Sequence, residues 1–113
     1  MINKNEESFA NNYVNIITIE GHLTSDVVLT RCDSKNVYKA TFYIKNPNKT
    51  GNKIHFNELY VVVYGRKAKE CSRMLKKGDS CTVTGRLCLW EPDGVTKQSK
   101  GATVIGSEVY WRK

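Results

Sequence analysis

Residues 58–78 read ELYVVVYGRKAKECSRMLKKG and contain the clearest strand, turn and helix signals of the sequence. Within residues 58–64 every second side chain is a Leu or a Val, and Gly65 ends the run, which is typical of a β-strand with one buried face. From residue 66 to 76, apolar side chains recur at the spacing of an amphipathic helix, and Gly78 suits the left-handed cap that follows a helix. The stretch therefore predicts a strand, a tight turn and one short helix.

Working outward, β-branched and alternating segments predict four more strands. They span residues 14–23, 37–45, 80–90 and 102–111. Asn, Pro and Gly break the pattern between residues 46 and 53, which predicts a basic loop. Strands and helices do not alternate as they would in a parallel α/β sheet. The pattern predicts an all-β chain, folded as a five-stranded Greek-key OB-fold barrel with one α-helix between strands three and four.

The length and composition of the chain fit one domain. It has 113 residues, of which 40% are hydrophobic and 26% charged, so it has enough apolar side chains for a single core. Residues 1–12 are polar and have no apolar period, which predicts a flexible N-terminal arm. Residues 13–113 are then expected to form a single OB-fold domain.

The charge balance indicates a polyanionic or otherwise acidic partner, or else serves only solubility. Lys and Arg number 18 against 11 Asp and Glu, which gives a formal net charge of +7. No segment approaches the roughly 18 consecutive apolar residues of a membrane helix, and the N-terminus lacks the apolar segment of a signal peptide. The sequence predicts a cytoplasmic protein that does not associate with a membrane.

The residues that would indicate an enzyme or a metal site are not grouped in the sequence. The four cysteines have no Cys-x-x-Cys spacing, so we expect free thiols and no metal. His22 and His55 stand alone, and the glycines match neither phosphate-loop spacing. We therefore predict no catalytic residues and no cofactor.

Basic and aromatic side chains alternate on the faces of the predicted strands that point to solvent. They are Lys39, Tyr43, Lys45, Tyr60, Tyr64, Arg86 and Trp90. Single-stranded nucleic acid requires this combination, because cations follow the phosphates while flat rings stack on any base. An outward ring also serves to cover a sheet edge or to contact another subunit, so one ring alone does not decide between these roles. Tyr38, Phe42 and Trp111 are expected in the core.

Four segments, taken together in their order and spacing, resemble one family. They are VNIITIEGHL at 14–23, LYVVVYGRKA at 59–68, MLKKGD at 74–79 and VTGRL at 83–87. These segments are similar to the first strand, the third strand and helix, the turn and the fourth strand of bacterial-type single-stranded DNA-binding proteins. The resemblance runs from residue 14 to residue 111.

The resemblance implies sequence-tolerant binding and protection of single-stranded DNA in replication, recombination or DNA transfer, in a bacterial or mobile-element setting. It places Tyr64 where the family has a base-contacting aromatic, and Trp90 on a strand that carries a stacking Trp. It also places Thr41 and Tyr43 on the DNA-facing side of strand two. Glu58 departs from the pattern, because the family often has a Trp there.

The resemblance further implies a homo-oligomer, either a tetramer or a dimer, and replication proteins as additional partners. The acidic, Phe-ended tail with which the family recruits such proteins does not follow strand five in this sequence, which ends in Trp-Arg-Lys. Two other functions fit the residues. One is a primosome-like adaptor protein in replication restart, and the other is an RNA-binding OB module.

Overall fold

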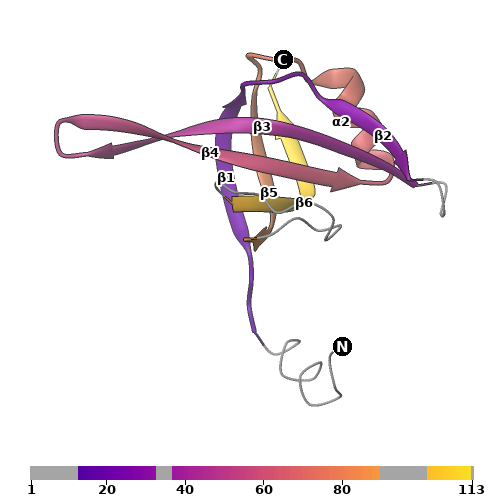
Figure 1. Cartoon of the computed structure of the whole chain (residues 1–113), viewed down its shortest axis with the longest axis horizontal. Coiled ribbons are helices and arrows are strands. Elements are labelled where there is room, and N and C mark those ends of the chain that lie inside the picture. The colour runs from indigo at the N-terminus through magenta and orange to yellow at the C-terminus, as the bar shows by residue number, and fades with distance from the viewer. Residues whose placement is uncertain (1–12, 33–36, 90–101, 113) are drawn as a thin grey trace.

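The computed structural model describes residues 13–32, 37–89 and 102–112. These residues form six strands and one helix (Figure 1). In chain order they are β1 (Ile17–Leu23), β2 (Val28–Cys32), β3 (Val37–Thr50), β4 (Lys53–Tyr64), α2 (Arg66–Met74), β5 (Ser80–Cys88) and β6 (Ala102–Trp111). The predicted N-terminal arm and Trp90 lie outside the described residues.

Five of the strands close into a barrel. The sheet order is β1-β5-β6-β4-β3-β2, and an additional pairing of β1 with β3 joins the two sides of the ring. The pairing of β4 with β6 is parallel, and the other pairings are antiparallel. The chain is thus all-β with a closed five-stranded barrel and one helix, consistent with the predicted OB-fold.

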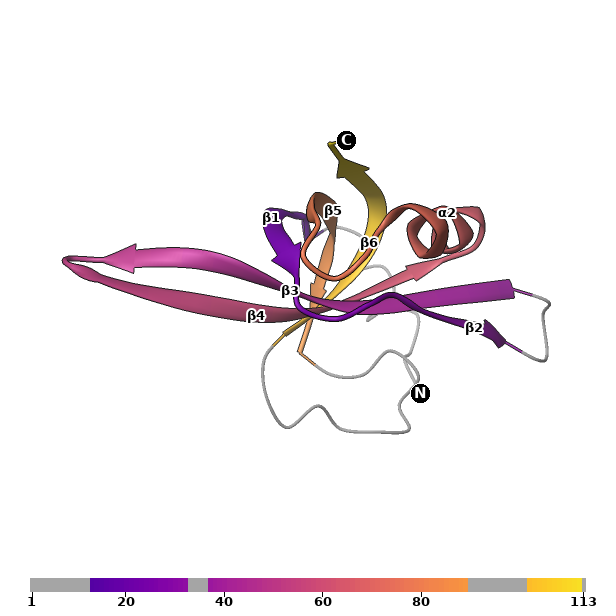
Figure 2. The same cartoon turned by 90° about the horizontal axis from the view of Figure 1, so that it is seen from above.

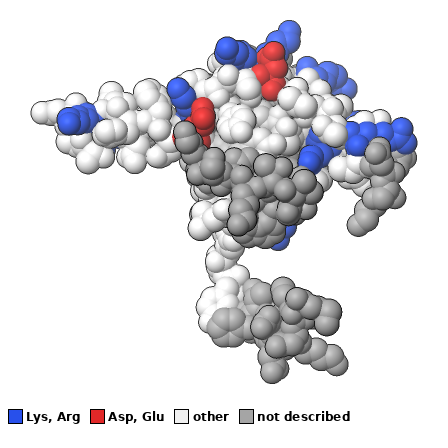
Figure 3. All heavy atoms as spheres, viewed as in Figure 1, with Lys and Arg blue, Asp and Glu red and all other residues white. Residues whose placement is uncertain are grey.

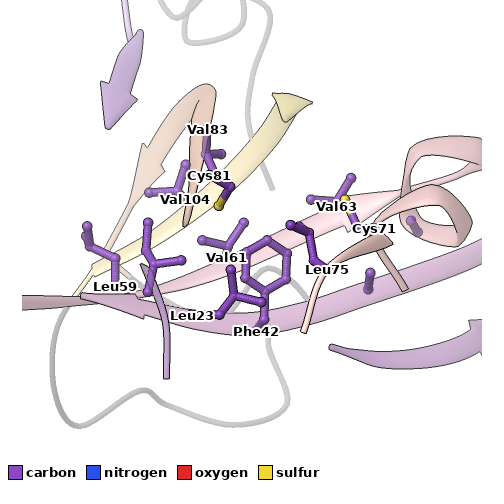
Figure 4. Close-up of a cluster of buried hydrophobic side chains, with 13 residues drawn as sticks. Leu23, Phe42, Leu59, Val61, Val63, Cys71, Leu75, Cys81, Val83 and Val104 are labelled. Atoms are coloured by element: carbon purple, nitrogen blue, oxygen red, sulfur yellow. The ribbon is translucent and has the colours of Figure 1, made fainter. Parts of the chain in front are cut away.

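The core fills the barrel because alternate residues of each strand point inward. Phe42 and Val61 are paired neighbours on β3 and β4 and are almost fully buried (Figure 4). Leu23, Val83 and Val104 bring β1, β5 and β6 into the same cluster. As predicted, Phe42 is in the core, while Tyr38 and Trp111 are partly buried and pack against it.

The helix closes one end of this core. Gly65 turns the chain from β4 into α2 with a φ of 78°, a conformation that glycine adopts without steric cost. Ala68 and Cys71 are the buried residues of α2. The predicted helix ran to residue 76, but the observed one ends at Met74 because Leu75 is extended, with its side chain in the core and its amide donating to Cys71 O at 2.9 Å.

The strand β2 was not predicted. All of its residues are exposed except the half-buried Cys32, and it pairs only with β3, so burial imposes no alternation on its sequence. Because β2 adds one strand before the helix, α2 lies between the fourth and fifth strands and not, as predicted, between strands three and four. The expected order of the other elements is unchanged.

The start of β1 also differs from the prediction. The strand was expected from residue 14 but begins at Ile17. Before it, the side chain of Asn15 takes the place of a backbone partner for β5. Its Nδ2 donates to Leu87 O at 3.0 Å, and Leu87 N donates to its Oδ1 at 2.9 Å. The Asn15 side chain thereby continues the hydrogen bonding along β5, although Asn15 itself is not part of a strand.

The predicted loop at 46–53 is wrong, because β3 and β4 remain paired far beyond the barrel. Their ladder runs through twelve pairs from Lys39 opposite Tyr64 to Thr50 opposite Lys53. We call residues 46–57 the hairpin arm. Figures 1 and 2 show it projecting away from the barrel. Pro47 is tolerated there because β3 has a partner strand on one side only at this point.

No helix in the described part of the chain is long and apolar enough to cross a membrane.

Candidate nucleic-acid interface

The face of β3 and β4 that points away from the core is continuous from the barrel to the end of the arm. Because Phe42 and Val61 point inward, their sequence neighbours on both strands point outward. We call this face the outer strip. Its residues are Lys39, Thr41, Tyr43, Lys45, Pro47 and Lys49 on β3, and Ile54, Phe56, Glu58, Tyr60, Val62 and Tyr64 on β4, of which Val62 is buried, with 2% of its surface exposed.

Seven of the eight predicted site residues lie on this side of the barrel. Six of them belong to the outer strip, and they are Lys39, Thr41, Tyr43, Lys45, Tyr60 and Tyr64. Arg86 on β5 is paired with Ile105, which is paired in turn with Val62 of the strip. The eighth, Trp90, lies outside the described residues.

Two tyrosines form the centre of the outer strip. Tyr43 and Tyr60 are directly opposite each other, with ring centroids 4.9 Å apart and planes inclined by 45°. Tyr43 is 36% exposed, and Tyr64, farther along β4, is 40% exposed. Both side chains are thus partly accessible to solvent, and Lys39 and Lys45 on the same strip supply positive charge.

Sequence reasoning missed the apolar side chains of the arm. Ile54 is 62% exposed and Phe56 is 54% exposed, and both have the same parity on β4 as Tyr60. The Lys45 Nζ lies 5.9 Å from the centroid of the Phe56 ring. The signal was available, because the alternation of residues 54, 56 and 60 continues that of the predicted strand, but the run of Asn, Pro and Gly before it indicated a loop.

Hydrogen bonds fix the base of the arm to the barrel. Asn46 Nδ2 donates to the backbone oxygen of Glu20 on β1 at 2.8 Å. Asn57 Nδ2 reaches Asn46 Oδ1 at 3.5 Å from the other strand of the arm. Glu58, which departs from the family pattern, lies opposite Lys45 in the register. Opposite charges across the strands partly cancel, so Glu58 leaves less negative potential on the strip than its sequence position suggested.

A comparison with protein-family models matches residues 14–110 to the family described as "Single-strand binding protein family". The chain belongs to this family. The match includes both strands of the outer strip and all of the barrel strands. The comparison with curated proteins gave no match.

Two solved structures have the same fold as this family member. One is the small single-stranded DNA-binding protein from Streptomyces coelicolor, with a TM-score of 0.72 and 21% identity over 89% of this chain and 94% of that one. The other is the SSB domain of a protein from Synechococcus sp., with a TM-score of 0.68 and 16% identity over 88% of this chain and 97% of that one.

The electrostatics of this single-strand binding family member favour an anionic ligand. Figure 3 shows Lys and Arg side chains on the arm and around the β2 and α2 end of the molecule, with fewer acidic groups between them. A hollow of about 810 Å³ lies between β1, β5 and the end of β6, and Lys45 and Pro47 of the outer strip also line it. It carries Glu20 as well as His22 and Arg112, so its charge is mixed.

The described residues do not form a metal-binding cluster. They contain no group of three or more His, Cys, Asp or Glu side chains that could hold a metal ion. The cysteines are free thiols, as expected. Burial raises the pKa of Cys71 to about 11 and that of Cys81 to about 12, which keeps both as neutral thiols.

Proposed function

We propose that this protein binds single-stranded DNA along the outer strip, with bases stacked on its aromatic rings and phosphates held by Lys and Arg. Membership of the single-strand binding protein family supports the ligand. The two solved structures with this fold support it further, because one is named as a single-stranded DNA-binding protein and the other as an SSB domain.

The observation that carries the proposal is the position of Tyr43 and Tyr60 between two lysines. The rings lie 4.9 Å apart on one outward face, and Lys39 and Lys45 flank Tyr43 on the same face of β3. Stacking on such rings needs no particular base, while the ammonium groups neutralise successive phosphates. The outer strip thus supplies both parts of sequence-tolerant binding.

The arm extends this surface beyond the barrel. Phe56 and Ile54 offer exposed apolar area in line with Tyr60, and Lys49 lies opposite Ile54. We propose that the bound strand runs from Tyr64 across the tyrosine pair and along the arm. Arg86 borders this path through Ile105, and Trp90 is proposed as a further stacking residue on the strength of the sequence resemblance.

The finer features of the family are also proposed for this chain. They are a Greek-key strand order, one binding domain over residues 13–113, a cytoplasmic setting and assembly into a homo-oligomer. Val14, Ile16 and Leu89 are 85%, 73% and 73% exposed, and apolar groups so open favour contact with a second copy. Light scattering is expected to give an oligomer mass in the absence of DNA, and a monomer mass at micromolar concentration would contradict the assembly.

A titration with labelled oligo-dT, oligo-rU and duplex DNA of matched length tests the proposed function. Oligo-dT is expected to bind most tightly, with an affinity that falls steeply with salt at about 0.7 in log-log slope per phosphate contact. Tighter binding of oligo-rU would favour an RNA-binding module. Binding that does not change with salt would contradict the phosphate contacts.

A pair of variants assigns the surface. Tyr43→Leu removes a ring from the outer strip and is expected to weaken oligo-dT binding by about 1 to 3 kcal/mol, the value of one stacked base. Tyr110→Leu is the matched control, because Tyr110 is 60% exposed on the part of β6 that extends past the β4 pairing. Equal losses in both variants would contradict the assignment.

A further inference from the structure

A groove of about 410 Å³ lies beside the end of the outer strip, where β2, β3 and the first turn of α2 meet. Its lining residues are Arg31, Val37, Tyr38, Gly65, Arg66 and Lys69. The groove is on the helix side of the sheet, because Tyr38 has the same parity on β3 as the inward-pointing Phe42, and Arg31 is the register partner of Tyr38. Figure 2 shows α2 on one side of these strands.

Three of the lining side chains are cations, and none of the described lining residues is acidic. Arg66 and Lys69 are three residues apart on α2, so they share one face of the helix, and Arg31 comes from β2. The Lys69 Nζ lies 4.3 Å from the centroid of the Tyr38 ring, which holds the ammonium at the groove. Three cationic side chains along one groove favour an anionic ligand there.

The groove begins where the outer strip ends. Tyr64 is the last residue of the strip on β4, and Gly65 and Arg66 follow it directly in the chain. Gly65 N donates to Tyr38 O at 2.8 Å, which ties the turn to the wall of the groove. A strand that passes Tyr64 therefore meets the three cations if it turns over this end of the sheet.

We propose that the groove binds a backbone phosphate of the same DNA strand after it has passed Tyr64, so that the bound strand bends around the sheet instead of leaving it there. The inference rests on the proposed function and names a second part of the binding path. Guanidinium groups suit a phosphodiester because they donate two parallel hydrogen bonds to its oxygens, and the Lys69 ammonium adds a point charge.

The test compares two double variants that remove the same charge. Arg31→Gln with Lys69→Gln alters the groove, and Lys76→Gln with Lys77→Gln alters two exposed lysines that follow the end of α2. Binding is measured over a ladder of oligo-dT lengths and salt concentrations. The groove variant is expected to bind short oligomers like the parent and to lose the gain that the parent shows on longer ones. Its salt slope on long oligomers is expected to fall by about 0.7 for the lost phosphate contact.

The outcomes separate the two proposals. If the parent binds no oligo-dT, the proposed function fails and this inference fails with it. A second outcome is that the parent binds oligo-dT but both double variants lose affinity equally at every length. The loss would then follow from the lower net charge of the protein and not from the groove. The groove proposal alone would be overturned. Inorganic phosphate, added at constant ionic strength, is expected to leave the length effect unchanged. Loss of that effect at micromolar phosphate would assign the groove to a free anion and overturn the proposal.

Discussion

The strands β3 and β4 belong to two different environments along their length. Inside the barrel, Phe42 and Val61 are buried while Tyr43 and Tyr60 face outward, so each strand has one face for stability and one for contact. In the arm, every residue of β4 from Lys53 to Asn57 is exposed. The arm therefore has no core to maintain, and both of its faces are free to carry contact residues. The paired strands β3 and β4 therefore stabilise the core at one end and extend a contact surface beyond the barrel at the other.

The variant expected to destabilise the barrel most, while leaving the arm unchanged, is Gly85→Ala, which adds a methyl group. A Cβ there would lie 2.0 Å from the backbone oxygen of Ile105, and neither backbone can move without opening the ladder of β5 and β6. Gly85→Ala is expected to destabilise the fold by more than about 4 kcal/mol, enough to abolish cooperative unfolding. Urea denaturation followed by circular dichroism measures this.

Gly51→Ala in the turn of the arm is the control for that variant. A Cβ at Gly51 meets no atom within 4 Å, and only its φ of 63° is unfavourable for alanine. We expect a loss of about 1 kcal/mol. If Gly51→Ala unfolded the protein, the arm would be part of the cooperative core.

Removing a ring on each side of the boundary sharpens the comparison. Phe42→Ala leaves a cavity in the barrel and is expected to cost about 3 to 5 kcal/mol of unfolding free energy. Phe56→Ala removes a ring that is 54% exposed, and its effect on stability is expected to stay within about 0.5 kcal/mol. If the two variants shifted the midpoint of urea unfolding by similar amounts, the Phe56 side chain would have to be packed against other residues.

The effect of Phe56→Ala should instead be a loss of affinity for DNA. Loss of one stacked base is expected to weaken oligo-dT binding by about 1 to 3 kcal/mol, with the unfolding midpoint unchanged. Fluorescence anisotropy of a labelled oligomer measures the change, and Tyr110→Ala serves as the exposed aromatic control outside the strip. Unchanged affinity in Phe56→Ala would confine the binding surface to the barrel.

The last comparison concerns the response to alkaline pH, which comes from two buried thiols of the core, Cys71 and Cys81. Burial raises the pKa of Cys71 to about 11 and of Cys81 to about 12, whereas the unfolded chain releases these protons near pH 9. The folded state therefore holds more protons between pH 9 and 11, and stability should fall as the pH rises through that window. The urea midpoint measures this fall, and Cys71→Ala with Cys81→Ala should reduce it. A fall of the same size in that variant would assign it to other groups.

The sequence predicted the barrel because burial leaves a periodic trace in it. Each barrel strand has an inner face, and residues such as Val61 and Val83 mark that face by alternation. The outward positions of Tyr43 and Tyr60 followed from the same parity, so most of the candidate site was predicted together with the fold. A signal that depends on burial is present only where a strand has a buried side.

The sequence did not predict β2 or the hairpin arm, because neither has a buried side. Strand β2 is almost entirely exposed, and the arm is held by its ladder and by the contact of Asn46 with β1. The groove beside α2 could not be predicted from sequence, because Arg31 and Lys69 are brought together only when β2 pairs with β3 and the helix packs on that pair.

The order of the ladders also has a consequence for the route by which the chain folds. The pairs of β3 and β4 nearest the turn join residues that are close in sequence, as Thr50 and Lys53 are, so this hairpin can zip up from its tip within about 1 to 10 μs. Closing the ring must instead join Ile17 to Gly85 and Leu59 to Ala102, which requires long loops to close first. Folding of the whole barrel is then expected in the millisecond to second range of chains rich in distant contacts. The ribbon that reaches out of the finished molecule is thus the part expected to form earliest, before there is a barrel for it to project from.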